Sequence, residues 1–171
     1  SLAESNSAGP MIDAMPQRGP LTAVTNSLNV ITRLSGEPRI DVISTGGTYR
    51  HGYDAFFGMI ATDAASRLQA DILFMSTTAI DHGYCCHKSE ETVQFKHALI
   101  KSSAFKVLLV DHSKFGLRAL HKLAPVTDFD LIITDDGIAA ADRTELESRG
   151  VTVEIAPLDE TAGSAVGQRM G

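Results

Sequence analysis

The sequence FKVLLVDHSKFG, residues 105–116, decides the fold class of this chain. Its segment 106–111 is apolar at every position from Val107 to Val110 and contains two β-branched valines. A short apolar run without alternating polar positions is typical of a strand that is buried on both faces, as in a parallel sheet. Polar residues 111–114 follow at once. The stretch therefore predicts a buried parallel strand that ends in a polar loop.

Further short apolar runs rich in β-branched residues lie on either side of this strand. Longer segments separate most of them, and their apolar residues recur every three or four positions, as in amphipathic helices. This alternation predicts an α/β fold with an open, mainly parallel sheet and right-handed crossovers. A glycine-rich turn at 46–54 is compatible with the start of an antiparallel excursion. The other predicted strands are residues 21–25, 40–45, 71–76, 131–134 and 151–156, and the predicted helices are residues 26–35, 54–68, 89–103 and 139–149.

The composition is that of one acidic globular domain. The chain has 171 residues, of which 43% are hydrophobic, and its formal net charge is -6. Such a surface repels a phosphate backbone, so the chain by itself is predicted to bind nucleic acid poorly. No apolar run approaches the roughly 18 residues needed to span a bilayer, and the N-terminus lacks the regions of a secretory signal. The two adjacent cysteines form no disulfide framework, which favours a reducing cytoplasm.

Segments without periodicity are expected at both ends. Residues 1–20 are rich in Ser, Ala, Gly and Pro, begin like a cloning remnant and allow one helical turn at 11–15. We therefore predict a tail over 1–20, one domain over 21–158 and a second tail over 159–171.

Polar residues follow each of the first five predicted strands. In an open parallel sheet the carboxyl ends of the strands share one edge, and ligands bind in the crevice there. The loops therefore predict a single small-molecule crevice. They are Thr25-Asn26-Ser27, Gly46-Gly47-Thr48-Tyr49-Arg50, Ser76-Thr77-Thr78 leading to Asp81-His82-Gly83, Asp111-His112-Ser113-Lys114 and Thr134-Asp135-Asp136-Gly137.

Two of these loops have a structural interpretation beside the functional one. Asn26 and Ser27 suit the N-cap of the next helix, and a helix N-terminus also suits an anion. Gly46-Gly47 permits positive φ and close approach of a ligand, although a plain turn is the commoner explanation. The nearby Arg50 favours anion binding, because guanidinium recognises phosphate and carboxylate bidentately.

Asp111 and Lys114 form the most informative pair. Lys114 stands where a helical segment over 114–121 is predicted to begin, and a cation there opposes the helix dipole. Either pairing with Asp111 or an anionic ligand removes this conflict, and we favour the ligand. On composition alone, Glu91 and Lys96 belong to a solvated helix face that follows a Ser89 cap.

A metal site is not predicted. His82, Cys85, Cys86 and His87 are zinc-ligand types within six residues, but adjacent cysteines lack the usual two-residue gap and no second pair exists. No base can be assigned to activate either cysteine as a nucleophile. We expect neither a metal nor a cofactor.

Five stretches of the sequence together resemble a known family. They cover about residues 20–156 and look like the C-terminal effector domain of DeoR-family bacterial transcription regulators. Residues 108–116 followed by 132–135 are the most specific part of the resemblance. The stretches are LTAVTNSLNVITRL (21–34), VISTGGTYR (42–50), ADILFMSTTAIDHGY (70–84), EETVQFKHALIKSSAFKVLLVDHSKFG (90–116) and DFDLIITDDGI (128–138).

The resemblance implies a Rossmann-like α/β sheet with helices on both faces, related to ribose-5-phosphate isomerase. It implies that a phosphorylated sugar or related metabolite changes the operator affinity of an N-terminal winged helix-turn-helix, in a homodimer or homotetramer. Neither that module nor the strand and phosphate loop expected before 11–15 is recognised here. The implied ligand-binding residues are Thr25, Asn26, Ser27, Gly46, Gly47, Thr48, Arg50, Thr77, Thr78, Asp81, Glu91, Lys96, Asp111 and Lys114.

Three functions follow from these observations. The first is a non-enzymatic sensor domain whose ligand shifts a conformational or oligomeric equilibrium. The second is a sugar-phosphate isomerase with Asp111 or Glu91 as base and Lys114 stabilising an enediolate. The third is an oligomerisation module with a vestigial pocket. We favour the sensor.

Overall fold

The computed structural model describes residues 12–13 and 15–156. The predicted C-terminal tail, 159–171, and much of the predicted N-terminal tail lie outside these residues. The described part of the N-terminal tail includes a short 3₁₀ helix, Met15–Arg18, and the buried Ile12. The predicted domain boundaries stay a prediction.

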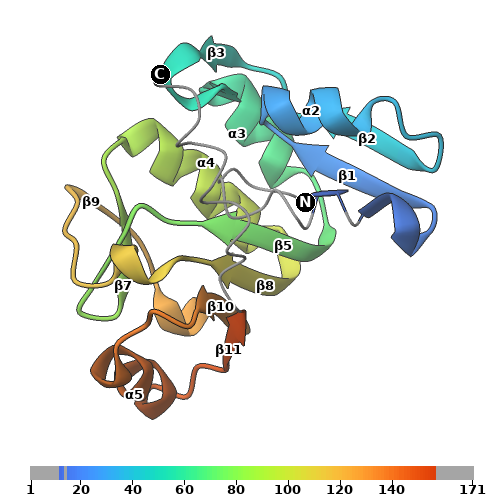
Figure 1. Cartoon of the computed structure of the whole chain (residues 1–171). Helices are drawn as coiled ribbons and strands as arrows, with labels where there is room; N and C mark the ends of the chain where they lie inside the picture. The colour runs from blue at the N-terminus through green and yellow to red at the C-terminus, as the bar shows by residue number, and fades with distance from the viewer. Residues whose placement is uncertain (1–11, 14, 157–171) are drawn as a thin grey trace, which may run out of the picture.

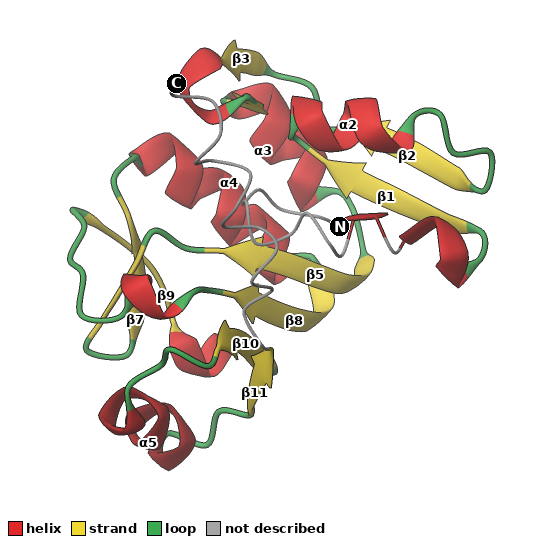
Figure 2. Ribbon diagram, viewed as in Figure 1, coloured by secondary structure: helices red, strands yellow, loops and turns green. Residues whose placement is uncertain are grey.

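The central sheet has four parallel strands, as the apolar runs predict (Figures 1 and 2). Their order is β11-β10-β8-β5, and β8 therefore lies between two neighbours. In the register, Val107 of β8 is opposite Phe74 of β5 and Leu131 of β10. The strands are β5 (Ala70–Ser76), β8 (Ser103–Leu109), β10 (Leu131–Asp135) and β11 (Val153–Ala156).

The two faces of this sheet bury different side chains. Because alternate residues of a strand point to opposite faces, Leu108 joins one apolar cluster whereas Val107 and Leu109 join another. The first cluster contains side chains of α3 (Met59–Ser66), α4 (Glu90–Lys101) and α5 (Ala140–Ser148). The second contains side chains of α2 (Leu28–Leu34). The prediction of a mainly parallel sheet with helices on both faces is confirmed.

A separate parallel pair precedes this sheet in the chain. β1 (Leu21–Thr25) pairs with β2 (Ile40–Ser44), and α2 connects them. Thr25 lies opposite Ser44 in the register, so the two strands end side by side. This places both of their polar loops at one edge.

Short antiparallel strands complete the fold. The predicted excursion after β2 is confirmed as a hairpin of β3 (Thr48–Arg50) and β4 (Ala55–Phe57). The helix predicted over 54–68 therefore begins later than expected, at Met59, because β4 takes up residues 55–57. A second antiparallel sheet, in the order β6-β7-β9, was not predicted. Its strands are β6 (Ala79–Asp81), β7 (Tyr84–His87) and β9 (His121–Pro125).

The helix predicted over 114–121 is wrong. Residues His112–Lys114 form one 3₁₀ turn, η4, and His121 already begins β9. Gly116 interrupts the segment with a φ of 75° and donates its backbone N–H to the carbonyl of Ile80. Tertiary pairing therefore replaces the expected helix.

The described helices include none that is long and apolar enough to cross a membrane.

Shortening a side chain of β8 tests the importance of this strand. Leu108 is 0% exposed, so Leu108→Ala is expected to lower the free energy of unfolding by about 2–5 kcal/mol through lost burial and a cavity. Leu120, 84% exposed, is the matched control, and Leu120→Ala is expected to change it by less than about 0.5 kcal/mol. Urea denaturation measures both, and equal effects would contradict the assignment of β8 as the core strand.

Candidate functional site

The loop after β1 is buried and caps a helix. Ser27 Oγ accepts a hydrogen bond from Val30 N–H at 3.4 Å, and Thr25 Oγ1 accepts one from Ser27 N–H at 3.0 Å. Thr25, Asn26 and Ser27 are all buried. The capping interpretation of this loop is therefore confirmed, and its implied contact with a ligand stays a prediction.

Asn26 attaches the β3–β4 hairpin to the end of β1. Its Nδ2 donates to the carbonyl of Phe56 at 2.9 Å, and Phe56 N–H donates to the carbonyl of Asn26 at 2.9 Å. The backbone of Leu28 also donates to Asp54. The hairpin thus lies against the carboxyl end of β1.

Gly47, in the loop after β2, is required by contacts within the protein. Gly46 and Gly47 have φ of 67° and 113°, and a Cβ on Gly47 would lie 2.5 Å from the carbonyl oxygen of Phe57. The same Cβ would lie 3.1 Å from Cβ of Ala61 in α3. The loop is therefore packed against the hairpin and the start of α3.

Arg50 and Glu91 form a bidentate ion pair between the hairpin and α4. The Arg50 Nε and an Nη donate to the two carboxylate oxygens of Glu91, each at 3.0 Å. A Cβ on Gly58 would lie 3.6 Å from Glu91 Oε1 and 3.9 Å from Thr48 Oγ1. The structure therefore brings Thr48, Arg50 and Glu91 together, although Arg50 already has an anionic partner. Glu91 is part of an inter-element tie and not merely a solvated face.

Lys96 is buried against the carboxyl end of β5 and does not lie on a solvated helix face. The residue is 3% exposed, its Nζ donates to the carbonyl of Ser76 at 2.7 Å, and His87 Nε2 lies 3.2 Å away. Burial and then the Lys96 charge lower the pKa of His87 to about 3. The neutral imidazole can therefore accept a hydrogen bond from the ammonium.

Thr77 and Thr78 fasten the β6–β7 hairpin to this end of β5. Their Oγ1 atoms donate to the carbonyl of Cys86 at 3.1 and 2.9 Å. Asp81, at the end of β6, forms an ion pair with Arg118 at 3.2 Å and a contact with His82 at 2.6 Å. These three predicted residues are therefore structurally engaged, and their contact with a ligand stays a prediction.

Asp111 does not use its carboxylate on Lys114. Asp111 Oδ1 accepts hydrogen bonds from the backbone N–H of Ser113 at 3.0 Å and from the Ser113 hydroxyl. Asp111 is thereby the N-cap of η4. Within residues 12–13 and 15–156, Lys114 makes no ion pair. One of the two predicted ways to compensate its charge is thus not used.

His112 and Asp135 form a contact that the sequence reasoning missed. Asp135 is 7% exposed and accepts from His112 N–H at 2.8 Å, from Gly137 N–H at 2.8 Å and from His112 Nδ1 at 2.6 Å. Burial opposes ionisation of Asp135, but the hydrogen bonds from His112 and Gly137 outweigh it and lower the carboxyl pKa. The ends of β8 and β10 are thereby joined. Both residues stand in predicted strand-end loops, and the parallel order of these strands was the available signal.

One cavity lies beside these loops, and a second lies at the opposite end of the sheet. The first, of about 200 Å³, is enclosed by the β6–β7 turn, residues 115–116 and α5. The second, of about 670 Å³, lies between the α3–β5 connection and the C-terminus of α4, where Lys101 and Ser103 line it. The first cavity is lined by one of the predicted loops, Asp81-His82-Gly83, but neither cavity is lined by Arg50 or Lys114. The predicted crevice therefore stays a prediction.

Cys85 and Cys86 are both buried free thiols. Burial raises the pKa of Cys85 to about 12, which disfavours the thiolate needed for nucleophilic or metal chemistry. Among the residues that the structure describes, no three His, Cys, Asp or Glu side chains are grouped to hold a metal ion.

Comparison with known proteins now gives the family. The family profile described as the DeoR C terminal sensor domain matches residues 2–136. The chain belongs to the DeoR family of transcription regulators. This DeoR sensor domain is similar to the HTH-type transcriptional regulator GlpR of Haloferax volcanii, with 35% identity over 81% of the chain and 54% of the relative.

Two further relatives of this DeoR domain come from Escherichia coli. One is the glycerol-3-phosphate regulon repressor of strain K12, with 31% identity over 67% of the chain and 46% of that protein. The other is a putative aga operon transcriptional repressor of strain O157:H7, with 30% identity over 77% of the chain and 49% of that protein. The chain spans about half the length of the curated relatives it matches.

Replacement of Gly47 tests the close packing of its loop. Gly47→Ala is expected to lower the free energy of unfolding by about 1–3 kcal/mol, since the φ of 113° at this position and the nearby carbonyl of Phe57 both disfavour a side chain. Gly36 has no atom within 4 Å of a built Cβ, so Gly36→Ala is the control and should change stability by less than about 1 kcal/mol. Urea denaturation decides, and a neutral Gly47→Ala would exclude the packing argument.

The lowered pKa of Asp135 predicts an acid-dependent contribution to stability. A carboxyl with a depressed folded-state pKa stabilises the fold above its unfolded pKa of about 3.9, and this contribution is lost as pH falls through the folded pKa. Wild type should therefore exceed Asp135→Asn in stability at pH 7, and the difference should shrink below about pH 4. Denaturant titrations across this range measure it. The control Asp136→Asn removes an adjacent exposed carboxylate. A stability difference between wild type and Asp135→Asn that does not change with pH would refute the linkage.

Proposed function

We propose that this DeoR-family domain is a non-enzymatic sensor that binds a phosphorylated sugar or related metabolite at the carboxyl ends of its strands. In the whole protein, ligand binding would change the operator affinity of a winged helix-turn-helix outside this chain. The proposal includes a homodimer or homotetramer as the working unit. It rests on the family match and on the chemistry of the strand-end loops.

The observation that carries the proposal is the position of Lys114. Lys114 is the last residue of η4, and within the described ranges it makes no ion pair. Its charge is therefore available to an anion supplied by a ligand. Phosphate is a suitable anion for a lysine point charge.

Arg50 contributes differently from the expectation. Glu91 occupies the edge of the guanidinium formed by Nε and one Nη and supplies a counter-charge, so a phosphate is less favoured there than at Lys114. We therefore assign the phosphate to Lys114 first. Arg50 holds Glu91 beside Thr48 and Gly58, where oxygens of Glu91 and Thr48 could accept hydrogen bonds from sugar hydroxyls.

The names of relatives suggest where to look for the ligand. One is a repressor of a glycerol-3-phosphate regulon, and another is named for the aga operon. Phosphorylated polyols are therefore the first compounds to test on this chain.

The isomerase alternative receives less support. Its two candidate bases are engaged, Asp111 by Ser113 and Glu91 by Arg50, and the relatives are named as regulators. Turnover of ribose 5-phosphate that disappears in Asp111→Ala would nevertheless establish it over the sensor.

Thermal-shift titration tests the sensor function. Glycerol 3-phosphate, ribose 5-phosphate and fructose 6-phosphate are added in turn, and at least one should raise the melting temperature of wild type in a saturable way. Lys114→Ala should weaken that binding by about tenfold or more, as expected for the loss of a charge-assisted contact.

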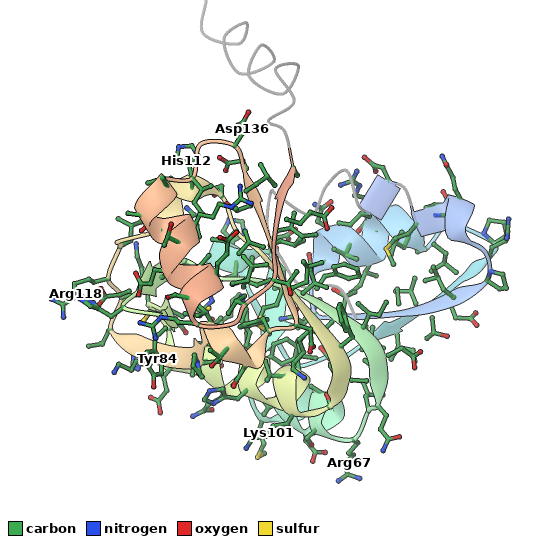
Figure 3. The ribbon with its side chains drawn as sticks, turned by 90° about the horizontal axis from the view of Figure 1, so that it is seen from below. Arg67, Tyr84, Lys101, His112, Arg118 and Asp136 are labelled. Atoms are coloured by element: carbon green, nitrogen blue, oxygen red, sulfur yellow. The ribbon has the colours of Figure 1, made fainter. Side chains whose placement is uncertain are left out.

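Lys101 supplies the matched control for this experiment. It lies at the opposite end of the domain from His112 (Figure 3) and lines the far cavity. Lys101→Ala removes the same charge and should leave ligand affinity unchanged. If Lys114→Ala and Lys101→Ala weaken binding equally, the effect comes from the net charge of the protein and not from Lys114. If none of the phosphates binds wild type, the proposal is rejected.

A further inference from the structure

We propose that His112 is a hydroxyl-recognising residue of the sensor site, held in position by Asp135 and Gly137. The inference rests on the proposed function and names a residue absent from the expected site. The class of ligand it implies is a phosphate monoester that also carries a hydroxyl group near the phosphate.

His112 is held by two hydrogen bonds to the carboxylate of Asp135, one from its backbone and one from its ring. Its backbone N–H donates to Asp135 Oδ2 at 2.8 Å, and its Nδ1 lies 2.6 Å from Asp135 Oδ1. A neutral ring that donates from Nδ1 has its lone pair on Nε2. The buried carboxylate thus selects which nitrogen faces outward, and it also makes Nε2 a better acceptor.

The outward nitrogen is available to a ligand. The His112 side chain is 46% exposed, whereas that of Asp135 is 8% exposed. In the described part of the chain, Nε2 has no hydrogen-bond partner. His112 and Asp136 lie together at one end of the domain (Figure 3). A ligand hydroxyl can therefore donate to Nε2 without displacing an existing bond.

Gly137 leaves room for this arrangement. A Cβ at Gly137 would lie 2.5 Å from His112 Nδ1 and 2.8 Å from Asp135 Oδ1. A side chain at 137 would therefore push the ring away from the carboxylate. Glycine is therefore needed at position 137 to leave room for the His112 ring, and not because the backbone there has an unusual φ.

Lys114 completes the argument because it shares η4 with His112. The ammonium is a suitable partner for the phosphate, and Nε2 is an acceptor two residues earlier on the same turn. Together the two side chains distinguish a hydroxylated phosphate ester from a simple alkyl phosphate. The His112–Asp135 contact also fastens β8 to β10, so a test must separate that structural role from ligand recognition.

The variant His112→Asn makes this separation. An asparagine amide reaches about as far as Nδ1 of histidine, so it can keep a donor to Asp135 while it removes Nε2. Affinities are measured by thermal-shift titration for glycerol 3-phosphate, ribose 5-phosphate and fructose 6-phosphate, and for n-propyl phosphate, which has no hydroxyl. His112→Asn is expected to weaken the hydroxylated ligand by roughly tenfold and n-propyl phosphate by less than about twofold.

Two further variants complete the experiment. Gly137→Ala retains both ring nitrogens but displaces them, and should weaken the hydroxylated ligand as His112→Asn does. The control Lys101→Ala changes an exposed side chain at the far cavity, and affinity should not change.

A spectroscopic measurement reports on Nε2 directly. In ¹H–¹⁵N spectra of the imidazole rings, His112 should show the Nδ1–H tautomer at pH 8, and Asp135→Ala should abolish that preference. The hydroxylated ligand should shift the Nε2 resonance, and n-propyl phosphate should not.

The outcomes separate this inference from the function on which it rests. Equal loss of both ligand types in His112→Asn, or an unmoved Nε2 resonance with bound ligand, would overturn the role of His112 and leave the sensor function intact. Failure of every phosphate to bind wild type would overturn both.

Discussion

Burial of β8 on both faces is the constraint on which the rest of the domain depends. Leu108 packs into one apolar cluster and Val107 and Leu109 into the other, so this strand cannot shift its register without exposing one set. Parallel pairing with β5 and β10 then sends all three strands toward the same edge. The loops that begin at Asp111 and follow Asp135 meet there because the core leaves them no other place. The geometry of the candidate site is a consequence of packing.

This dependence explains which elements were predictable from sequence. The parallel strands are buried on both faces, and their apolar runs carry that information locally. The strands of the β3–β4 hairpin are three residues each and take their partners from the tertiary fold. The same holds for β9, where Gly116 turns the chain with a φ of 75° before His121 pairs with His87. Local spacing could not distinguish that segment from a short helix.

The shared edge of the strand-end loops was predictable from sequence, and the side-chain pairings at that edge were not. The strands β5, β8 and β10 are parallel as expected, yet Arg50 pairs with Glu91 41 positions away and His112 with Asp135 23 positions away. Such partners follow from which strands are neighbours, and one sequence does not give the strand order. Asp111 shows how local bonds decide between alternatives. Pairing with Lys114 was one of two open interpretations and not the favoured one, and the carboxylate instead accepts from a backbone N–H two residues on and caps η4.

The two sides of the proposed site differ in how firmly they are held. His112 is fixed by a buried carboxylate that accepts three hydrogen bonds, and removal of such a partner is costly. The tip of the β3–β4 hairpin is held to α4 by an ion pair whose side chains are 48% and 31% exposed, and pairs of this kind contribute at most about 1 kcal/mol. The body of this hairpin is held by further contacts, because Asn26 and Phe56 exchange hydrogen bonds and Phe57 of β4 packs against Phe95 of α4. A ligand that contacts both sides would therefore act on the Arg50–Glu91 contact before the β8–β10 side, and only to the extent that it binds the two arrangements with different affinity.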